Sequence, residues 1–131
     1  MWVSSHPDDE DPMLWQDMET GVFHSIQHNL EASQDKQNTG TSRDQPCQVG
    51  THQFSLDGFE WFYTGAAYTN LVEYTDGSHH LFNRRERPHL VFKGAQLVGD
   101  PIYLTNSAQY GTGTNPGSGA NNDDQCYTLV Q

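Results

Sequence analysis

The feature that most constrains this chain is a series of short runs rich in aromatic and β-branched residues, separated by turn-forming residues. Two of the turns carry an Asp-Gly pair between apolar runs, at Asp57-Gly58 and Asp76-Gly77. This dipeptide is one of the strongest local signals for a β-hairpin. The 3.6-residue periodicity of an amphipathic helix is absent nearly everywhere. The sequence therefore predicts an all-β protein built from antiparallel hairpins.

The runs pair into four consecutive hairpins followed by one more strand. The expected pairs are residues 13–15 with 21–28, 49–55 with 60–64, 70–74 with 79–83, and 88–93 with 100–105, and the last strand is 127–130. Two polar segments, residues 31–46 and 111–124, are expected to be surface loops. Strands spaced about 8 to 12 residues apart suit a sandwich, a barrel or the blades of a propeller.

Composition limits the partners that such a chain can bind. Aromatic residues make up 11% of the 131 residues, which argues against disorder. Only 34% are hydrophobic, so we expect a partner, a cross-link or further chain to complete the core. The formal net charge of -11 repels phosphate backbones and anionic bilayers. The sequence thus predicts neither a nucleic acid nor a membrane as partner.

The cysteines and histidines give little support for a metal ion or another cofactor, and we expect none. Cys47 and Cys126 lack the short paired spacing of a zinc site or a redox motif. A disulfide between them is one expectation, and two buried thiols are the other. The seven histidines include no H-E-x-x-H pattern. No run approaches the roughly 18 apolar residues that a membrane-spanning helix requires. For the location of the protein, we expect the extracellular space or the secretory pathway.

Two charged clusters are candidates for chemistry. Residues 8–11 are four successive carboxylates before Pro12, and mutual repulsion in such a run is one physical route to a functional acid. Charge alone favours a solvated surface segment there. Residues 84–87 place three arginines around Glu86, either as a salt-bridge network or as forked donors for a sugar or carboxylate. A third segment, 55–61, joins an Asp-Gly turn to Trp61, and we interpret it as structural more than catalytic.

Three segments in order carry a resemblance to a known group of enzymes. Residues 10–17 with 21–24 hold an Asp-Pro pair that opens a strand, and residues 50–61 hold a Ser-x-Asp-Gly-x-x-Trp hairpin. Residues 85–92 hold a glutamate just before a proline and a strand. This order resembles the five-bladed β-propeller glycosidases of glycoside hydrolase families 43 and 32, over residues 6 to 106.

The resemblance implies a site with two carboxyl groups. Glu86 would be the general acid that protonates the leaving oxygen, and Asp11 the carboxylate that orients substrate and modulates the pKa of that acid. The base or nucleophile of those families, an aspartate from an earlier blade, has no counterpart in this sequence, so hydrolysis by this chain alone stays open. The partner implied is a carbohydrate. The residues expected to contact it are Trp15, His52, Trp61, Arg85 and Arg87.

Chain length bounds how much of a propeller is present. Blades take about 40 to 50 residues and closed rings have at least four, so 131 residues supply two or three blades of an incomplete propeller. We therefore expect one β domain, residues 1–131, that is a segment of a larger propeller or a homo-oligomer. Two alternatives remain. One is a non-catalytic β module for carbohydrate binding or for self-assembly into an oligomer or filament. The other is a small secreted sandwich with a Cys47–Cys126 disulfide.

Overall fold

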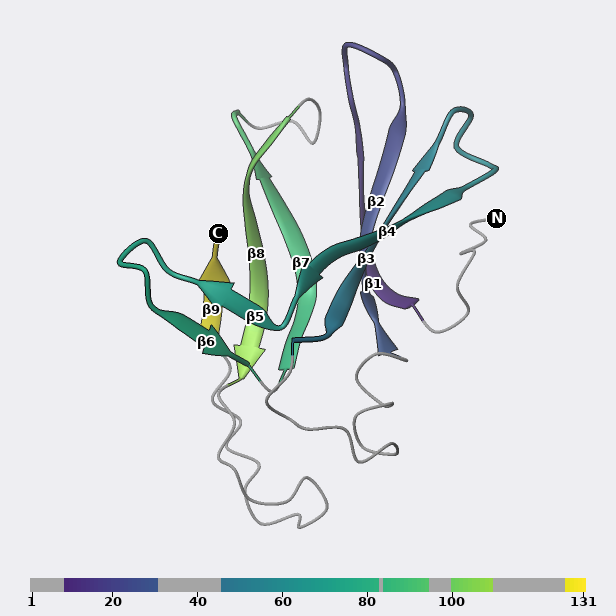
Figure 1. Ribbon diagram of the computed structural model, residues 1–131. Helices are drawn as coiled ribbons and strands as arrows, with labels where there is room; N and C mark the ends of the chain where they lie inside the picture. Colours follow the sequence, from purple (N-terminus) through teal and green to yellow (C-terminus); the bar gives the residue numbers. More distant parts are fainter. Residues whose placement is uncertain (1–8, 31–45, 83, 95–99, 110–126) are drawn as a thin grey trace.

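The computed structural model describes residues 9–30, 46–82, 84–94, 100–109 and 127–131. These residues form antiparallel strands and no helix, which confirms the predicted all-β class (Figure 1). One sheet has four strands in sequence order: β1 (Asp9–Gln16), β2 (Phe23–Asn29), β3 (Gln48–Ser55) and β4 (Phe62–Thr69). A two-stranded sheet follows: β5 (Leu71–Glu73) and β6 (His79–Leu81). The third sheet holds β7 (Arg84–Phe92), β8 (Pro101–Gln109) and β9 (Tyr127–Val130).

Each predicted hairpin is present, and several strands are longer than predicted. β1 begins at Asp9 and β7 at Arg84, while β4 continues to Thr69 and β8 to Gln109. In the extensions of β1, β7 and β8, polar and charged side chains bond to the neighbouring strand, as Asp9 does with Gln27 and Arg85 with Asn106. Of the expected loops, residues 31–45 and 111–124 lie outside the described residues.

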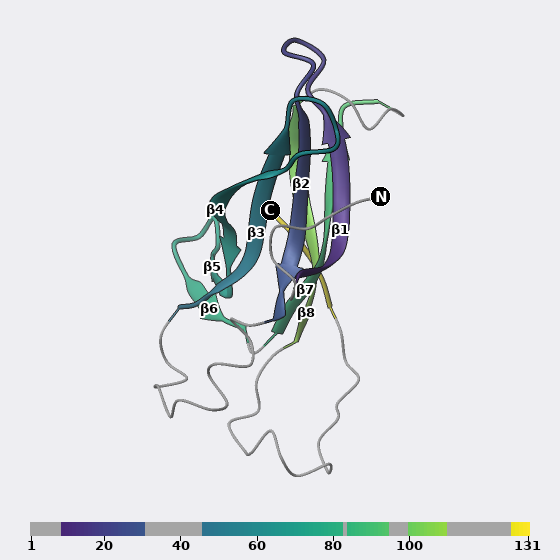
Figure 2. The same ribbon diagram turned by 90° about the vertical axis from the view of Figure 1, so that its right-hand side faces the viewer.

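The four-stranded sheet packs against the three-stranded sheet, and the main core lies between them. The two sheets stand side by side in Figure 1 and one behind the other in Figure 2. Both sheets contribute to one buried apolar cluster: Met13, Ile26, Val49, Tyr68, Leu90 and Phe92. The backbone N–H of Leu90 also points at the sulfur of Met13, 2.7 Å away, so β1 and β7 are in direct contact. The first strands of the two sheets are therefore neighbours.

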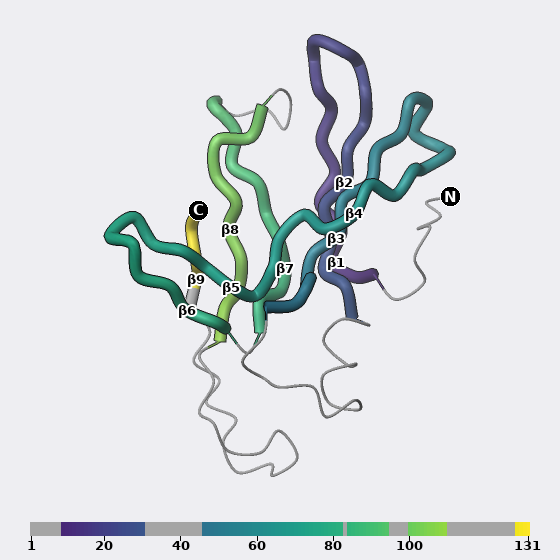
Figure 3. The backbone as a smooth tube through the Cα atoms, viewed as in Figure 1, coloured from purple at the N-terminus to yellow at the C-terminus, as the bar shows by residue number. Residues whose placement is uncertain are grey.

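Strand β4 leads from the four-stranded sheet into the two-stranded sheet. Figure 3 shows the backbone leaving the four-stranded sheet through β4 and continuing into β5, beside β8 and β9. Buried Asn70 holds this junction, since its amide Oδ1 accepts from the N–H of Cys47 at 2.8 Å and its Nδ2 donates to the carbonyl of Phe82 at 3.1 Å. A second, smaller core lies here, formed by Val72, Phe82 and Ala108.

The Asp57-Gly58 turn closes the β3–β4 hairpin as predicted. The Asp57 carboxylate accepts from the backbone N–H of Phe59 at 2.8 Å and of Glu60 at 3.0 Å, and these bonds hold its pKa below the ordinary value. Gly58 has φ of 78°, a conformation that glycine adopts without a steric penalty. The turn is thus fixed by local bonds.

Candidate functional site

The acidic residues before Pro12 lie in strand β1. Asp9 and Glu10 pair with Asn29 and His28 of β2, and Glu10 Oε1 lies 3.1 Å from Nδ1 of His28. Ladder pairing and polar partners thus hold Asp9 and Glu10 in the sheet, whereas Asp11 is exposed. Residue 8 lies outside the described part of the chain.

Asp9 is the centre of a buried polar cluster that sequence reasoning missed. Its Oδ2 accepts from Nε2 of Gln27 at 2.6 Å and from Oγ1 of Thr51 at 3.2 Å. A longer contact of 3.5 Å joins it to Nε2 of Gln53. All three donors are fully buried. A carboxylate with several buried donors anchors β1 to β2 and β3.

Strands β1 and β7 share the same distortion. In each, the register with the next strand shifts around a residue-proline pair, Asp11-Pro12 in β1 and Arg87-Pro88 in β7. The residue before the proline has φ of 52° in both strands. Within the described ranges, Asp11 and Arg87 are the only non-glycine residues with positive φ.

This backbone conformation is unfavourable for both residues. Positive φ costs a residue with a Cβ of the order of 1 kcal/mol or more, and a following proline restricts it further. Such a conformation persists only where the surrounding structure imposes it, and it is concentrated at ligand and catalytic sites. The matched outliers therefore mark Asp11 and Arg87 as the first candidates for function.

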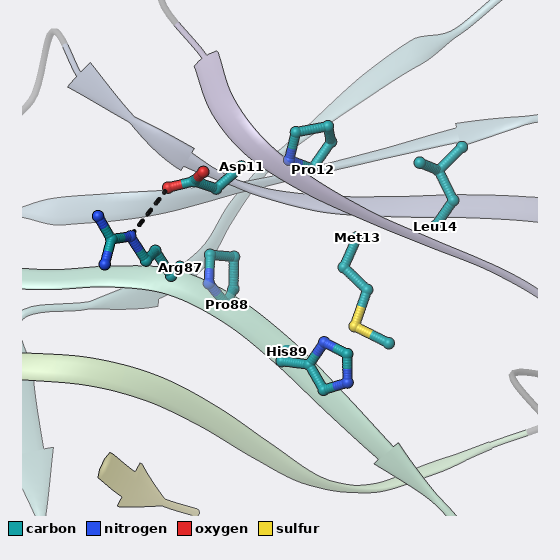
Figure 4. Close-up of a pocket in the computed structure, with 7 residues that line it drawn as sticks. All are labelled: Asp11, Pro12, Met13, Leu14, Arg87, Pro88 and His89. Carbon is teal, nitrogen blue, oxygen red and sulfur yellow. Dashed lines mark ion pairs between the residues drawn. The ribbon is translucent and has the colours of Figure 1, made fainter. Parts of the chain in front are cut away.

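The two side chains face each other at an open pocket of about 650 Å³ (Figure 4). Nε of Arg87 lies 3.9 Å from Oδ2 of Asp11. This separation is too long for a direct hydrogen bond, and both side chains are largely exposed, so each keeps bonding capacity for a third group. The lining residues are Asp11, Pro12, Met13, Leu14, Arg87, Pro88 and His89.

Glu86, the predicted general acid, is adjacent in sequence to this pocket but does not line it. Its side chain is partly buried, and Oε1 lies 3.9 Å from Nε of Arg84. Burial is the main cause of the raised pKa of the Tyr68 hydroxyl, and the negative charges of Glu86 and Asp11 raise this pKa further. The structure therefore brings the two predicted carboxyl groups to neighbouring strands near one phenol.

Tyr68 is a second residue that sequence reasoning missed. Its ring lies flat against the backbone of Gly50, where an added Cβ would be 2.0 Å from Cε1 of the ring. The guanidinium carbon of Arg85 lies 4.8 Å from the centroid of the Tyr68 ring, which is a cation–π contact. Gly50 thus makes room for the tyrosine that packs behind the two bulges.

Arg85, a predicted sugar contact, points into the protein. It donates to the carbonyl of Thr69 at 2.8 Å, to Oδ1 of Asn106 at 2.7 Å and to Oε1 of Gln131. Burial lowers the pKa of Arg85 to about 10, while the nearby Tyr68 opposes that shift. Arg85 is not among the residues that line the pocket, and its contacts tie β7 to β4 and β8.

His52 and Trp15, two further predicted sugar contacts, lie in a cluster outside the pocket lining. Trp15 stacks on His24 with ring centroids 4.9 Å apart, and Nδ1 of His24 lies 3.1 Å from Nε2 of His52. Nδ1 of His52 lies 2.6 Å from Oγ1 of Thr64, whose hydroxyl donates to the carbonyl of His52. Since that hydroxyl has one proton, His52 must donate from Nδ1 and accept at Nε2 from His24.

This assignment leaves His52 neutral, with its Nε2 as the acceptor of the bond from His24. Burial lowers the pKa of His24, although Asp17 opposes the shift, and burial together with His24 lowers the pKa of His52. A proton on Nε2 of His52 would remove the acceptor of the bond between the rings. The cluster is therefore a packed and bonded part of the fold at neutral pH.

The remaining predicted residues lie elsewhere. Trp61 is buried directly after the Asp57 turn and does not line the pocket. Cys47 is half-buried against the main core. Cys126 lies outside the described residues, so the predicted disulfide falls outside them too.

One sequence signal could have found the paired bulges. The pattern Glu-x-Pro-x-Leu occurs twice, at residues 10–14 and 86–90. The two copies differ in the residue before proline, and neither alone implies that the strands lie side by side. Asp9 and Tyr68 gave no comparable signal, because an acidic residue in a charged run and an aromatic in a strand are both ordinary.

Within the described ranges, no group of three or more His, Cys, Asp or Glu side chains could hold a metal ion. No helix in that part of the chain is long and apolar enough to cross a bilayer. Comparisons with protein-family models, with curated proteins and with solved structures found no match to this chain.

Proposed function

We propose that this chain is a carbohydrate-binding segment of the propeller-glycosidase type, which takes a glycosidic ligand in the pocket between the bulges of β1 and β7. The observation that carries the proposal is the pairing of Asp11 with Arg87, both at φ of 52°, across that pocket. A carboxylate and a guanidinium held a short distance apart can each form forked hydrogen bonds. Neighbouring hydroxyl groups of a sugar ring offer matching donors and acceptors.

The sheet arrangement supports an incomplete propeller. Strands β1 to β4 run antiparallel in sequence order, and so do β7 to β9. The first strands of the two sheets are neighbours, with the pocket at their junction. Propeller blades have this order, and their first strands line the central axis.

Hydrolysis is the catalytic form of the proposal. Glu86 would protonate the leaving oxygen, and Asp11 would orient the sugar and tune the acid, since the two come from neighbouring strands at one junction. A third carboxylate, as base or nucleophile, is not evident in the sequence. Binding is therefore the primary activity proposed, and a non-catalytic carbohydrate module is the second candidate.

Calorimetric titration with arabino-, xylo- and fructo-oligosaccharides tests the binding proposal. We expect Asp11→Asn and Arg87→Gln each to weaken binding at least tenfold, a change of about 1.4 kcal/mol. Asp76→Asn, in the exposed β5–β6 turn, makes the same chemical change away from the pocket and should bind as the wild type does. Equal affinity in all four proteins, or no binding by the wild type, would contradict the proposal.

Turnover of aryl arabinofuranosides, xylosides and fructosides separates the two candidates. If Glu86 is the acid, Glu86→Gln should lose turnover of substrates with poor leaving groups while it still binds the oligosaccharides. A wild type that binds sugar without any turnover would identify the non-catalytic module instead.

A further inference from the structure

The chain contains two Asp-Pro peptide bonds, Asp11–Pro12 within β1 and Asp100–Pro101 at the start of β8. All four of these residues are exposed. In such a pair, the aspartate side chain reaches its own backbone carbonyl carbon through a five-membered ring, so the attacking group is already in place. The proline nitrogen leaves as a secondary amine. The two bonds are chemically alike, and a difference in their reactivity must come from the fold.

The backbone distinguishes the two bonds. Among the described residues, positive φ at a non-glycine position occurs at Asp11 and Arg87, and not at Asp100. The planar peptide bond after Asp11 holds the proline ring against the backbone of this left-handed residue, which stores strain. That strain is released when the Pro12 nitrogen loses its planar geometry. The fold therefore lowers the barrier to cleavage after Asp11 and not after Asp100.

The carboxyl group of Asp11 is available for this attack. Its side chain is 44% exposed, and Nε of Arg87 lies 3.9 Å from Oδ2, too far for a direct hydrogen bond. By contrast, the Asp57 carboxylate is held in its turn by the backbone N–H of Phe59 at 2.8 Å. Rotation about the Cα–Cβ bond of Asp11 is the movement that the attack requires, and the loose ion pair allows it.

The Asp11–Pro12 bond also lies outside the strand ladder and faces water. Pairing of β1 with β2 stops at Glu10 and resumes at Met13, so Asp11 and Pro12 are left between paired residues. Both of them line the open pocket of about 650 Å³ (Figure 4). Water can therefore reach this bond, and the two new chain ends can move apart after cleavage.

We propose that this protein cleaves its own chain between Asp11 and Pro12. An oxygen of the Asp11 side-chain carboxyl group bonds to the backbone carbonyl carbon of Asp11, and the bond from that carbon to the Pro12 nitrogen breaks. The carboxyl proton passes to the nitrogen, and a cyclic anhydride remains. Water opens the anhydride and leaves Asp11 with its side-chain carboxyl and a new α-carboxyl group. One water molecule is consumed, and nothing is oxidised or reduced.

Cleavage would leave the fold in place and change the pocket. The residues before the cut stay attached, because Asp9 accepts hydrogen bonds from Gln27 at 2.6 Å and from Thr51 at 3.2 Å. The pocket gains an α-carboxyl group on one side of the cut and a secondary amine on the other. This self-processing does not depend on the proposed carbohydrate ligand, since it uses the Asp11–Pro12 bond and water alone.

Mass spectrometry of the full chain, denatured just before analysis, measures both bonds in one sample. The protein is incubated at the lowest pH that preserves its circular dichroism spectrum, because cleavage needs a carboxyl proton. A fragment that begins at Pro12 should form roughly tenfold faster, or more, than one that begins at Pro101, a difference in barrier of about 1.4 kcal/mol. In concentrated urea the strain is absent, so the two bonds should cleave at similar rates.

The chain supplies matched controls for the two causes. The bond after Arg87 also precedes a proline and follows a residue with φ of 52°, but it has no adjacent carboxyl group and should stay intact. Asp11→Asn should lose the fragment that begins at Pro12, whereas Asp100→Asn should keep it. Equal rates at the two Asp-Pro bonds of the folded chain, or no cleavage at either, would overturn the proposal. So would a preference for Asp11–Pro12 that persists in urea.

Discussion

At the scale of single residues, this protein fixes charged groups by unusual means. Asp11 and Arg87 are held in a left-handed backbone conformation at matched bulges, and their side chains meet without a direct hydrogen bond. Arg85 is buried and donates hydrogen bonds to oxygen atoms of Thr69, Asn106 and Gln131. The exposed pair is thus free to bind a ligand, while the buried arginine holds the strands behind it.

The histidine pair makes stability depend on pH. The pKa values of His24 and His52 are both lowered from 6.5, so the unfolded chain binds more protons than the folded one. Their contribution is complete above about pH 6.5 and is lost as the pH falls below that value. We expect the Tm of the wild type to be lower at pH 5 than at pH 8. In His52→Gln this decrease in Tm should be smaller.

Thermal unfolding followed by circular dichroism at constant ionic strength measures this difference. His79→Gln, at an exposed histidine of β6, is the control and should follow the wild type. The lowered pKa values of Asp17, Asp57 and Asp76 act at lower pH, since their ordinary value is 3.8. An equal fall in the wild type and in His52→Gln would show that the pair does not titrate as proposed.

At the scale of strands and hairpins, the sequence predicted the pairing well and the strand ends poorly. Asp57-Gly58 and the alternation along residues 22–28 are local signals, and local chemistry alone forms those hairpins. β1 and β7 begin earlier than predicted because their charged residues are satisfied by partners distant in sequence, such as Gln27 for Asp9. Those partners cannot be read from local pattern.

The residues of the predicted site also fall into those that a local sequence pattern indicated and those that depend on contacts between distant strands. Asp11, Arg87 and Glu86 are each near a proline in a repeated pattern, and the structure brings them to one junction. The contribution of Tyr68 depends on its packing on Gly50, a contact between different strands. The sequence therefore indicated the charged groups of the site but not the framework behind them.

Leu14 of β1 and Leu90 of β7, each two residues after a proline, should respond differently to truncation. Leu90→Ala should cost about 2 to 5 kcal/mol of unfolding free energy because Leu90 is buried in the core. Leu14→Ala should cost less than about 1 kcal/mol because Leu14 is largely exposed in a single chain. Urea unfolding at micromolar chain concentration measures both values. Equal costs would contradict the different burial of the two leucines.

At the scale of the whole molecule, two sheets of the same kind meet at their first strands, and the junction carries the pocket. The apolar core between them joins residues from both sheets, including Met13 and Leu90. Leu14 is 42% exposed, whereas Ser25 and Gln53, which share its sheet face, are fully buried. The proposed ligand pocket therefore depends on how the first strands of the two sheets pack against each other.

The most direct test is to map the binding of an oligosaccharide by NMR on the isotope-labelled protein. The account predicts that backbone amide signals at both bulges, Asp11 and Met13 in β1 with Arg87 and His89 in β7, shift together with one dissociation constant. Signals of the Asp76 turn should not move. Shifts at only one bulge, or confined to the aromatic β3–β4 turn around Phe59, would contradict the claim that the two bulges form one site.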